Sequence, residues 1–289
     1  MSQVLLMARI TWQEAWSRRL VLAILLLTVG FLGFYLLGVQ FLDERLRSRA
    51  AELGRSDDLE GFLIARATVE TLGMYIVNFL GNLLAVLVAL STISGEIDSG
   101  TLQSILTKPI RRYQVVLGKW LGFAALVALF VTLISSGLLV GVKTLTGYLP
   151  PSPLEVVALM NLGAQLLLAV TILGGTLFST LTNGVVLFTL YGLSVAGGIV
   201  GSIGQLFRVP LLETLNAVSI AILPSDAIWR GASYYLQPVQ LLNAFSEAGA
   251  RGNPFVSTAP PDPIVLLWTG VYLLLALLLG VGVFNRRDL

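Results

Sequence analysis

Long apolar runs alternate with short polar segments along the chain of 289 residues. A helix needs roughly 20 apolar residues to cross a hydrocarbon core of about 30 Å, and only helices or closed barrels satisfy their backbone there. No run alternates strictly between apolar and polar residues, as a barrel strand would. The pattern therefore predicts an all-α polytopic membrane protein with six transmembrane helices, at about 20–42, 71–93, 115–142, 155–180, 184–206 and 263–284.

Residues 2–19 form a separate amphipathic element before the first span. Leu5, Ala8 and Trp12 recur at helical spacing, and arginines occupy the other side. Tryptophan on the apolar face and arginine on the polar face favour an interfacial elbow helix in the inner headgroup layer. An ordinary charged flank is the alternative. The first apolar run is too long for the core of a signal peptide, and we expect it to be retained as a span.

Two polar segments between spans are long enough to fold. Residues 43–70 have helix-forming composition and mixed charge, which predicts a solvated helical hairpin broken at Gly54 and Gly61. Residues 207–262 contain apolar stretches that are too short to span, and these favour short re-entrant or interfacial helices between spans five and six. We expect one transmembrane domain over residues 1–289, with both segments outside the cytoplasm.

Composition excludes several classes of function. The chain is 56% hydrophobic and 12% charged, and it has neither cysteine nor histidine. Disulfides, thiolate metal sites and histidine catalysis are therefore impossible, and we expect no metal and no cofactor on this chain. An intramembrane enzyme would need Ser, Lys or Asp alone, and no predicted span has Lys or a carboxylate in its middle. We expect the chain not to be an enzyme.

The basic residues predict the orientation in the membrane. With the N-terminus inside, the inner segments carry nine basic and four acidic residues, whereas the outer segments carry nine basic and twelve acidic residues. The inner segments are also shorter, so their density of Lys and Arg is higher, as the positive-inside rule requires. We expect a plasma (inner) membrane protein with both termini in the cytoplasm. Its partners should include the lipid bilayer but no nucleic acid.

The segment SGEIDSGTLQSILTKPIRR, residues 94–112, is the most polar inner connection. Asp98, Ser99 and Gly100 can end one helix and cap another. A short helix from Thr101 to Lys108 would place its apolar residues on one face, and Pro109 would stop it. Such a helix can be gripped by a partner protein, although a polar loop that binds lipid headgroups fits the pattern too. Its apolar face would comprise Leu102, Ile105 and Leu106.

The same segment resembles the signature of ABC-2 type permeases, the membrane subunits of type V ABC exporters. The matching residues are Glu96, Ser99-Gly100-Thr101-Leu102, Lys108-Pro109-Ile110, Arg112 and Gly118-Lys119. Six spans, the elbow helix, the short helices before the last span and an Arg-Arg-Asp-Leu tail are also similar to that family. Size and layout most resemble the branch of permeases that serves copper delivery to nitrous oxide reductase.

The resemblance implies that residues 95–109 form a cytoplasmic coupling helix between spans two and three, seated on an ABC ATPase subunit. ATP and Mg would be bound by that partner. The sequence agrees, because Gly118-Lys119 is followed by Trp120 and residue 113 is Tyr, so no P-loop is present. A second copy, or a paralogous permease, would complete the membrane domain. The implied ATPase interface is Glu96, Asp98, Ser99, Gly100, Thr101, Leu102, Ile105, Leu106, Lys108, Pro109 and Arg112.

A few polar and small residues inside the spans are candidates for a substrate pathway. Asn78 and Asn82 lie one turn apart on the second span, as do Asn161 and Gln165 on the fourth. Intramembrane polar residues are costly and often functional, but each pair can equally join neighbouring helices. Gly197 and Gly201 form a G-x-x-x-G pattern on the fifth span, which favours close helix packing within the chain or across a dimer.

Two functions fit the sequence. The first is the permease of an ABC exporter that couples ATP hydrolysis on a separate subunit to substrate movement. The second is a nontransporting membrane module that transmits the motion of the ATPase to an extracytoplasmic partner. Nothing in the sequence identifies the substrate.

Overall fold

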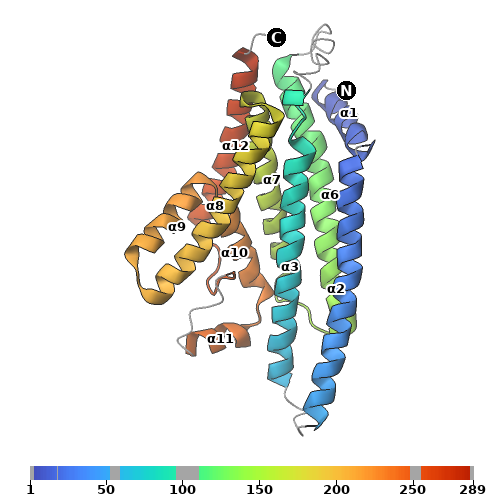
Figure 1. Cartoon of the computed structure of the whole chain (residues 1–289), viewed down its shortest axis with the longest axis vertical. Helices are drawn as coiled ribbons and strands as arrows, with labels where there is room; N and C mark the ends of the chain where they lie inside the picture. The colour runs from blue at the N-terminus through green and yellow to red at the C-terminus, as the bar shows by residue number, and fades with distance from the viewer. Residues whose placement is uncertain (1–2, 18, 53–58, 96–110, 248–254, 287–289) are drawn as a thin grey trace.

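The computed structural model describes residues 3–17, 19–52, 59–95, 111–247 and 255–286. In this part of the chain all regular structure is helical and there is no strand (Figure 1). The helices are α1 (Gln3–Ser17), α2 (Arg19–Glu52), α3 (Leu59–Ala89), α6 (Arg112–Thr146), α7 (Pro153–Leu177), α8 (Thr180–Phe207), α9 (Pro210–Ile222), α10 (Ser225–Leu236), α11 (Val239–Glu247) and α12 (Pro263–Arg286).

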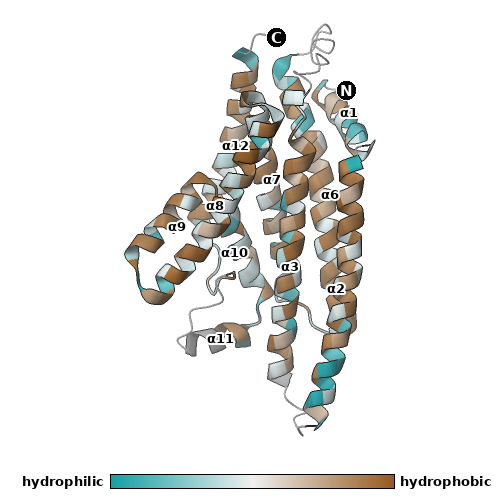
Figure 2. Ribbon diagram, in the orientation of Figure 1, coloured by the Kyte–Doolittle hydropathy of each residue, from teal (hydrophilic) through white to brown (hydrophobic). Residues whose placement is uncertain are grey.

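Six of these helices are long and apolar enough to cross a membrane, namely α2, α3, α6, α7, α8 and α12. Each overlaps one predicted span, so the prediction of an all-α protein with six candidate spans is confirmed. Hydrophobic residues cover the middle of the long helices, and hydrophilic residues gather at the C-terminal end of α2 (Figure 2). α2, at 34 residues, and α6, at 35, exceed the length that a bilayer requires.

Helices α3, α6 and α7 form the centre of the bundle. They contact one another, α2 packs against α3 and α6, and α12 packs against α7 and α6. Phe123, Leu138 and Leu168 are completely buried in the core between them, and Leu84 and Met160 are nearly so. The outward faces of α2 and α12 remain apolar and exposed, as is expected of helices that face lipid.

Helix α8 diverges from the bundle, and α9 folds back along it (Figure 1). No residue of α9 is buried. The chain then bends by 103° between α9 and α10, and α10 returns to pack against α7. Short helices between the fifth and sixth spans were predicted. Their placement within a membrane remains a prediction.

Local backbone chemistry sets several helix ends. α6 ends at Gly147, whose φ of 79° lies in the left-handed region where glycine has no steric penalty. Proline begins α7, α9 and α12, at Pro153, Pro210 and Pro263, where the missing amide hydrogen costs nothing. The chain reverses from α8 into α9 at Arg208, which has a left-handed φ of 55°.

The predicted solvated hairpin of residues 43–70 needs correction. Gly61 lies inside α3 and does not break it, because one glycine costs only about 1 kcal/mol in a helix that packs along its length. Asp43 and Glu70 are 6% and 0% exposed, so these two residues are buried rather than solvated. Gly54 lies outside the described residues, as does the predicted coupling helix, residues 95–109, apart from Gly95.

Candidate functional site

One end of the bundle holds α1, the start of α6 and the end of α12, and we call it the inner end, after the orientation that the basic residues predict (Figure 1). The predicted coupling segment begins and ends there, because Gly95 and Arg111 are the described residues that flank it. Of the residues predicted to contact an ATPase, only Arg112 is described. The rest lie outside the described residues: Glu96, Asp98, Ser99, Gly100, Thr101, Leu102, Ile105, Leu106, Lys108 and Pro109.

Lys119 joins the start of α6 to the end of α3. Its side chain is only 2% exposed, and its Nζ donates a hydrogen bond of 3.0 Å to the backbone oxygen of Thr92. Thr92 lies three residues beyond the end of α3. A cation near a helix C-terminus also interacts favourably with the helix dipole. Lys119 therefore fixes the last described turn before the coupling segment.

Arg112 joins the other side of the same segment to α12. Its Nη1 donates hydrogen bonds of 3.3 Å to the backbone oxygens of Phe284 and Asn285. The hydroxyls of Ser94 and Thr180 lie 2.7 Å apart and connect the end of α3 to the start of α8. Both flanks of the coupling segment are therefore attached to other helices of the bundle.

Gly118 and Gly122 place α1 directly against α6. A Cβ added to Gly118 would lie 2.5 Å from Cβ of Met7 and 3.0 Å from the backbone oxygen of Val4. A Cβ at Gly122 would lie 2.6 Å from the backbone oxygen of Ala8. Only glycine allows so close an approach of two helix backbones. The Gly118-Lys119 pair therefore connects α6 to both α1 and α3.

The polar residues predicted inside the spans make hydrogen bonds between helices. Asn82 donates 3.2 Å to the hydroxyl of Tyr191 on α8, and Asn161 donates 3.1 Å to Thr132 on α6. Gln165 donates 3.0 Å to the backbone oxygen of Ala124 on α6.

The amide oxygens of Asn82, Asn161 and Gln165 are buried without a hydrogen-bond partner among the described residues. Asn78 is buried on α3, one turn before Asn82.

The glycines of α8 receive side chains from α9 and α10. A Cβ at Gly201 would lie 2.5 Å from Cγ of Asn216, and one at Gly197 would overlap the side chain of Ser219. This contact lies within one chain. At Gly198 a Cβ would overlap the carboxylate of Asp226.

Asp226 and Arg230, one turn apart on α10, form an ion pair. Nε of Arg230 lies 2.6 Å from Oδ2 of Asp226, and Nη1 donates 2.7 Å to the hydroxyl of Ser202. Ser194 on α8 donates 2.7 Å to the backbone oxygen of Leu223 and accepts a 3.1 Å hydrogen bond from the backbone amide of Asp226. The bend between α9 and α10 is therefore attached to α8.

Comparison with known proteins identifies the kind of molecule that carries this arrangement. The family model for the ABC-2 family transporter protein matches residues 12–289. The chain belongs to the ABC-2 transporter family. It is also 32% identical over 253 residues to the probable ABC transporter permease protein NosY of Pseudomonas aeruginosa, covering 79% of this chain and 83% of the relative. The similarity to the NosY permease of Stutzerimonas stutzeri is 36% identity over 106 residues, which are 36% of this chain and 38% of that protein.

The resemblance to ABC-2 permeases is thus confirmed, and the chain is a multi-pass permease subunit of an ABC transporter. Among the described residues of this permease, no group of three acidic side chains is placed to hold a metal ion. That a motor subunit acts at the inner end of the permease remains a prediction. The role of each residue there remains a prediction.

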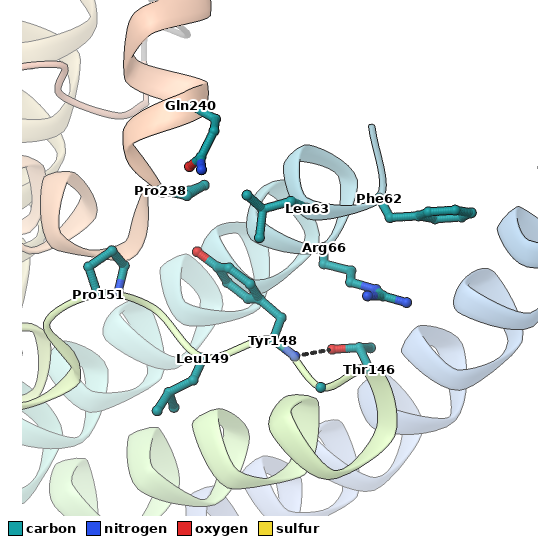
Figure 3. A pocket seen from close by; sticks show the side chains of 10 residues that line it. Phe62, Leu63, Arg66, Thr146, Tyr148, Leu149, Pro151, Pro238 and Gln240 are labelled. Atoms are coloured by element: carbon teal, nitrogen blue, oxygen red, sulfur yellow. Dashed lines mark hydrogen bonds between the residues drawn. The ribbon is translucent and has the colours of Figure 1, made fainter. Parts of the chain in front are cut away.

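The outer end of the permease, opposite the inner end, contains a cavity of about 790 Å³ between α3, the α6–α7 connection and α11 (Figure 3). Tyr148 lies on that connection and lines the cavity. Its backbone amide donates 3.2 Å to Oγ1 of Thr146, and its hydroxyl donates 2.8 Å to the backbone oxygen of Leu236. Burial raises the pKa of Tyr148, and the negative charge of Glu70 raises it further. Tyr148 therefore remains a hydrogen-bond donor.

An ionic network borders this cavity. Asp43 on α2 accepts from Arg47 and from Arg66, each with Nε at 2.7 Å from a carboxylate oxygen. Glu70 lies one turn after Arg66 on α3, and neither of its carboxylate oxygens has a hydrogen-bond partner among the described residues. The hydroxyl of Tyr35 donates to the backbone oxygen of Val69.

Sequence reasoning missed the burial of Lys119, Glu70 and Asn183. Asn183 is completely buried and donates 3.0 Å to the backbone oxygen of Thr171. The available signal at Asn183 was its position as a polar residue next to the break between the apolar helices α7 and α8. No sequence signal indicated that Glu70 is buried, because it lies at the edge of a charged segment.

Proposed function

We propose that this permease is the membrane subunit of an ABC exporter, in which two copies, or one copy and a paralogue, work with two ATPase subunits. Residues 95–109 would form the coupling helix that sits on the ATPase, and ATP and Mg would bind to that partner alone. Both termini would lie in the cytoplasm, with the protein in the plasma membrane. The resemblance to ABC-2 permeases supports the outward direction of transport.

The attachment of both flanks of the coupling segment supports this proposal most strongly. Lys119 connects the residues before the segment to α6, and Arg112 connects the residues after it to α12. α1 and α8 are joined to the same region through Gly118 and Thr180. Because packed helices move as rigid bodies, a displacement of residues 96–110 would be passed to α1, α3, α6, α8 and α12 at once.

Three buried amide oxygens support a pathway between helices. Asn82, Asn161 and Gln165 each have an oxygen without a partner among the described residues. A buried acceptor without a partner costs about 1 to 3 kcal/mol, which a bound polar substrate would offset. We propose these residues as pathway candidates, together with Asn78. Gly197 and Gly201 serve helix packing, because they receive α9 side chains.

Site-specific photocrosslinking tests the coupling interface directly. A photoreactive amino acid at position 104 of the tagged permease should capture one partner, whose sequence, read by mass spectrometry, contains a P-loop. Glu96→Ala should lower the crosslinking yield by about fivefold, the factor that corresponds to 1 kcal/mol. Gly100→Trp should remove the crosslink, because a bulky side chain would separate the two surfaces.

Glu155→Ala is the matched control, because Glu155 is an exposed carboxylate in the first turn of α7, away from the inner end. It should leave the crosslink unchanged. All variants should elute as the wild type does in size-exclusion chromatography, which shows that insertion and folding are intact. Capture of a partner without an ATP-binding motif would contradict the proposal, as would equal yields from Glu96→Ala and wild type.

A second candidate function is the nontransporting module, and the large outer cavity favours it. Such a module would pass the motion of the ATPase to a partner on the outer side, where the 790 Å³ cavity lies beside the Asp43 network. The two functions differ in whether the polar residues between the helices contact a substrate. Asn161→Leu together with Gln165→Leu would abolish transport by an exporter and would leave a nontransporting module active.

A further inference from the structure

A second, smaller cavity lies between α3 and the α10–α11 corner. Its volume is about 270 Å³, just below the range of about 300 to 1,000 Å³ for small-molecule sites. Three aromatic rings form much of its wall, and the centroid of Tyr75 lies 5.3 Å from that of Trp229 and 5.9 Å from that of Phe255. The cavity is lined by Thr68, Thr71, Leu72, Tyr75, Trp229, Gln237, Leu241, Phe255 and Val256.

The wall of this cavity is held in place by hydrogen bonds that leave its apolar surface free. Trp229 is 3% exposed, and its indole nitrogen donates 3.0 Å to the backbone oxygen of Phe255. The backbone amide of Ser257 donates 3.0 Å to the hydroxyl of Ser233 on α10. Because the indole donor is already used, Trp229 offers only its ring to a ligand.

Gln237, one of the residues that line this cavity, has an unsatisfied acceptor. The residue is 3% exposed, and its Nε2 donates to the backbone oxygens of Ser233 at 3.0 Å and Ser257 at 2.7 Å. Turning the amide over would place its oxygen against these two carbonyls, so the amide orientation is fixed. Its Oε1 is buried without a partner among the described residues. A group that donates one hydrogen bond would remove this cost.

The other polar groups of the cavity define the ligand further. The hydroxyls of Thr68 and Thr71 donate to the backbone oxygens of Ile64 and Ala67 within α3, at 2.8 Å each. At these two threonines the cavity therefore offers acceptors rather than free donors. No charged side chain is among the described residues that line it, so a charged ligand would not be compensated.

The position of the cavity indicates where the ligand comes from. Leu72 and Phe255 on its rim are 50% and 42% exposed, so it opens at the molecular surface. Leu72 and Tyr75 belong to the outer edge of the predicted span 71–93, where tyrosine and tryptophan mark the membrane interface. A molecule that reaches this site from the bilayer would have an apolar chain and a head at the interface.

We propose that this cavity binds an uncharged amphiphile with a single apolar chain and a hydroxyl head, which donates its hydrogen bond to Oε1 of Gln237. The aromatic wall receives the chain. The site belongs to the outer half of the molecule and does not depend on the proposed ATPase coupling, because binding requires no nucleotide.

Photolabelling of the purified permease in phosphatidylcholine nanodiscs tests this site. The probe is a ten-carbon alcohol with a diazirine in its chain, and labelled residues are located by mass spectrometry. We expect labelling within residues 68–75, 229–241 and 255–256 that is suppressed by 1-decanol. Methyl decyl ether, which has the same chain but no donor, should need about tenfold higher concentration, the factor for one hydrogen bond of 1.4 kcal/mol.

A matched pair of variants separates the cavity from the lipid surface. Leu72→Trp should fill the cavity and abolish the suppressible labelling, whereas Leu215→Trp should not, because Leu215 is equally exposed, at 49%, on α9. Equal competition by the alcohol and the ether would overturn the proposal and indicate a cavity that holds water or hydrocarbon only. Labelling confined to the lipid-facing residues of α2 and α12 would overturn it too.

Discussion

Lys119 shows how much a single residue can contribute at the inner end. The sequence places it in a signature and at the start of a span, and from there a solvated cation beside the membrane is expected. In the structure its ammonium group is buried against the backbone oxygen of Thr92, 27 residues earlier in the chain. No sequence pattern encodes this partner, because a backbone carbonyl is present at every residue.

Replacing Lys119 by methionine should destabilise the permease by about 2 kcal/mol, because a hydrogen bond to a charged group is lost and the carbonyl of Thr92 is left unsatisfied. Lys143→Met is the control, since Lys143 is exposed in the last turn of the same helix. Thermal unfolding in detergent, followed by circular dichroism, measures both. Equal unfolding temperatures for the two variants would show that the Lys119 hydrogen bond contributes nothing.

The polar residues of the spans were recognisable from sequence, but their partners were not. Asn161 and Gln165 stand out in an apolar helix, and both do contact the neighbouring helix α6. Whether they meet a substrate stays a prediction. Glu70 was hidden by its charged neighbours in sequence, although it is completely buried.

At the scale of helices, hydropathy predicted where each span lies better than where each helix ends. Bilayer thickness fixes the number of apolar residues in a span, whereas a helix continues as far as packing and propensity allow. α2 therefore continues ten residues beyond the predicted end at residue 42, to Glu52. α3 begins at Leu59, twelve residues before its predicted start, and includes Gly61.

Helix α8 packs closely against α9 at Gly201. Gly201→Ala should destabilise the permease by about 1 to 3 kcal/mol, because the new methyl group would overlap Asn216. Gly192→Ala on the same helix should stabilise it by about 0.5 to 1 kcal/mol, since nothing lies within 4 Å of that position and alanine favours helix. Thermal unfolding of the two single variants provides the comparison.

Size-exclusion chromatography with light scattering extends this comparison to assembly. If Gly201 serves contacts within one chain, Gly201→Ala should keep the oligomeric state of the wild type. A change of oligomeric state in Gly201→Ala, without loss of stability, would assign this glycine face to a contact between copies instead.

At the scale of the whole molecule, α1 and the end of α12 lie at the same end of the bundle (Figure 1). An even number of spans requires this, and the count of six was available from hydropathy alone. Hydropathy did not predict the divergence of α8 or the return of α9 along it, because the apolar surface of α9 shows no strong preference for one partner in sequence. Tertiary contacts such as those of Gly197 and Gly201 decide that arrangement.

The orientation of the molecule can be tested without altering a native cysteine, because the chain has none. Ser104→Cys should react with a membrane-impermeant maleimide only after the cells are opened, whereas Asp57→Cys should react in intact spheroplasts. The physical reason is the higher density of Lys and Arg on the segments beside residue 104. Each variant is its own control when labelling is repeated after permeabilisation. Labelling in the opposite sense would place residues 96–110 outside, where no ATP is available, and would contradict ATPase coupling through this segment.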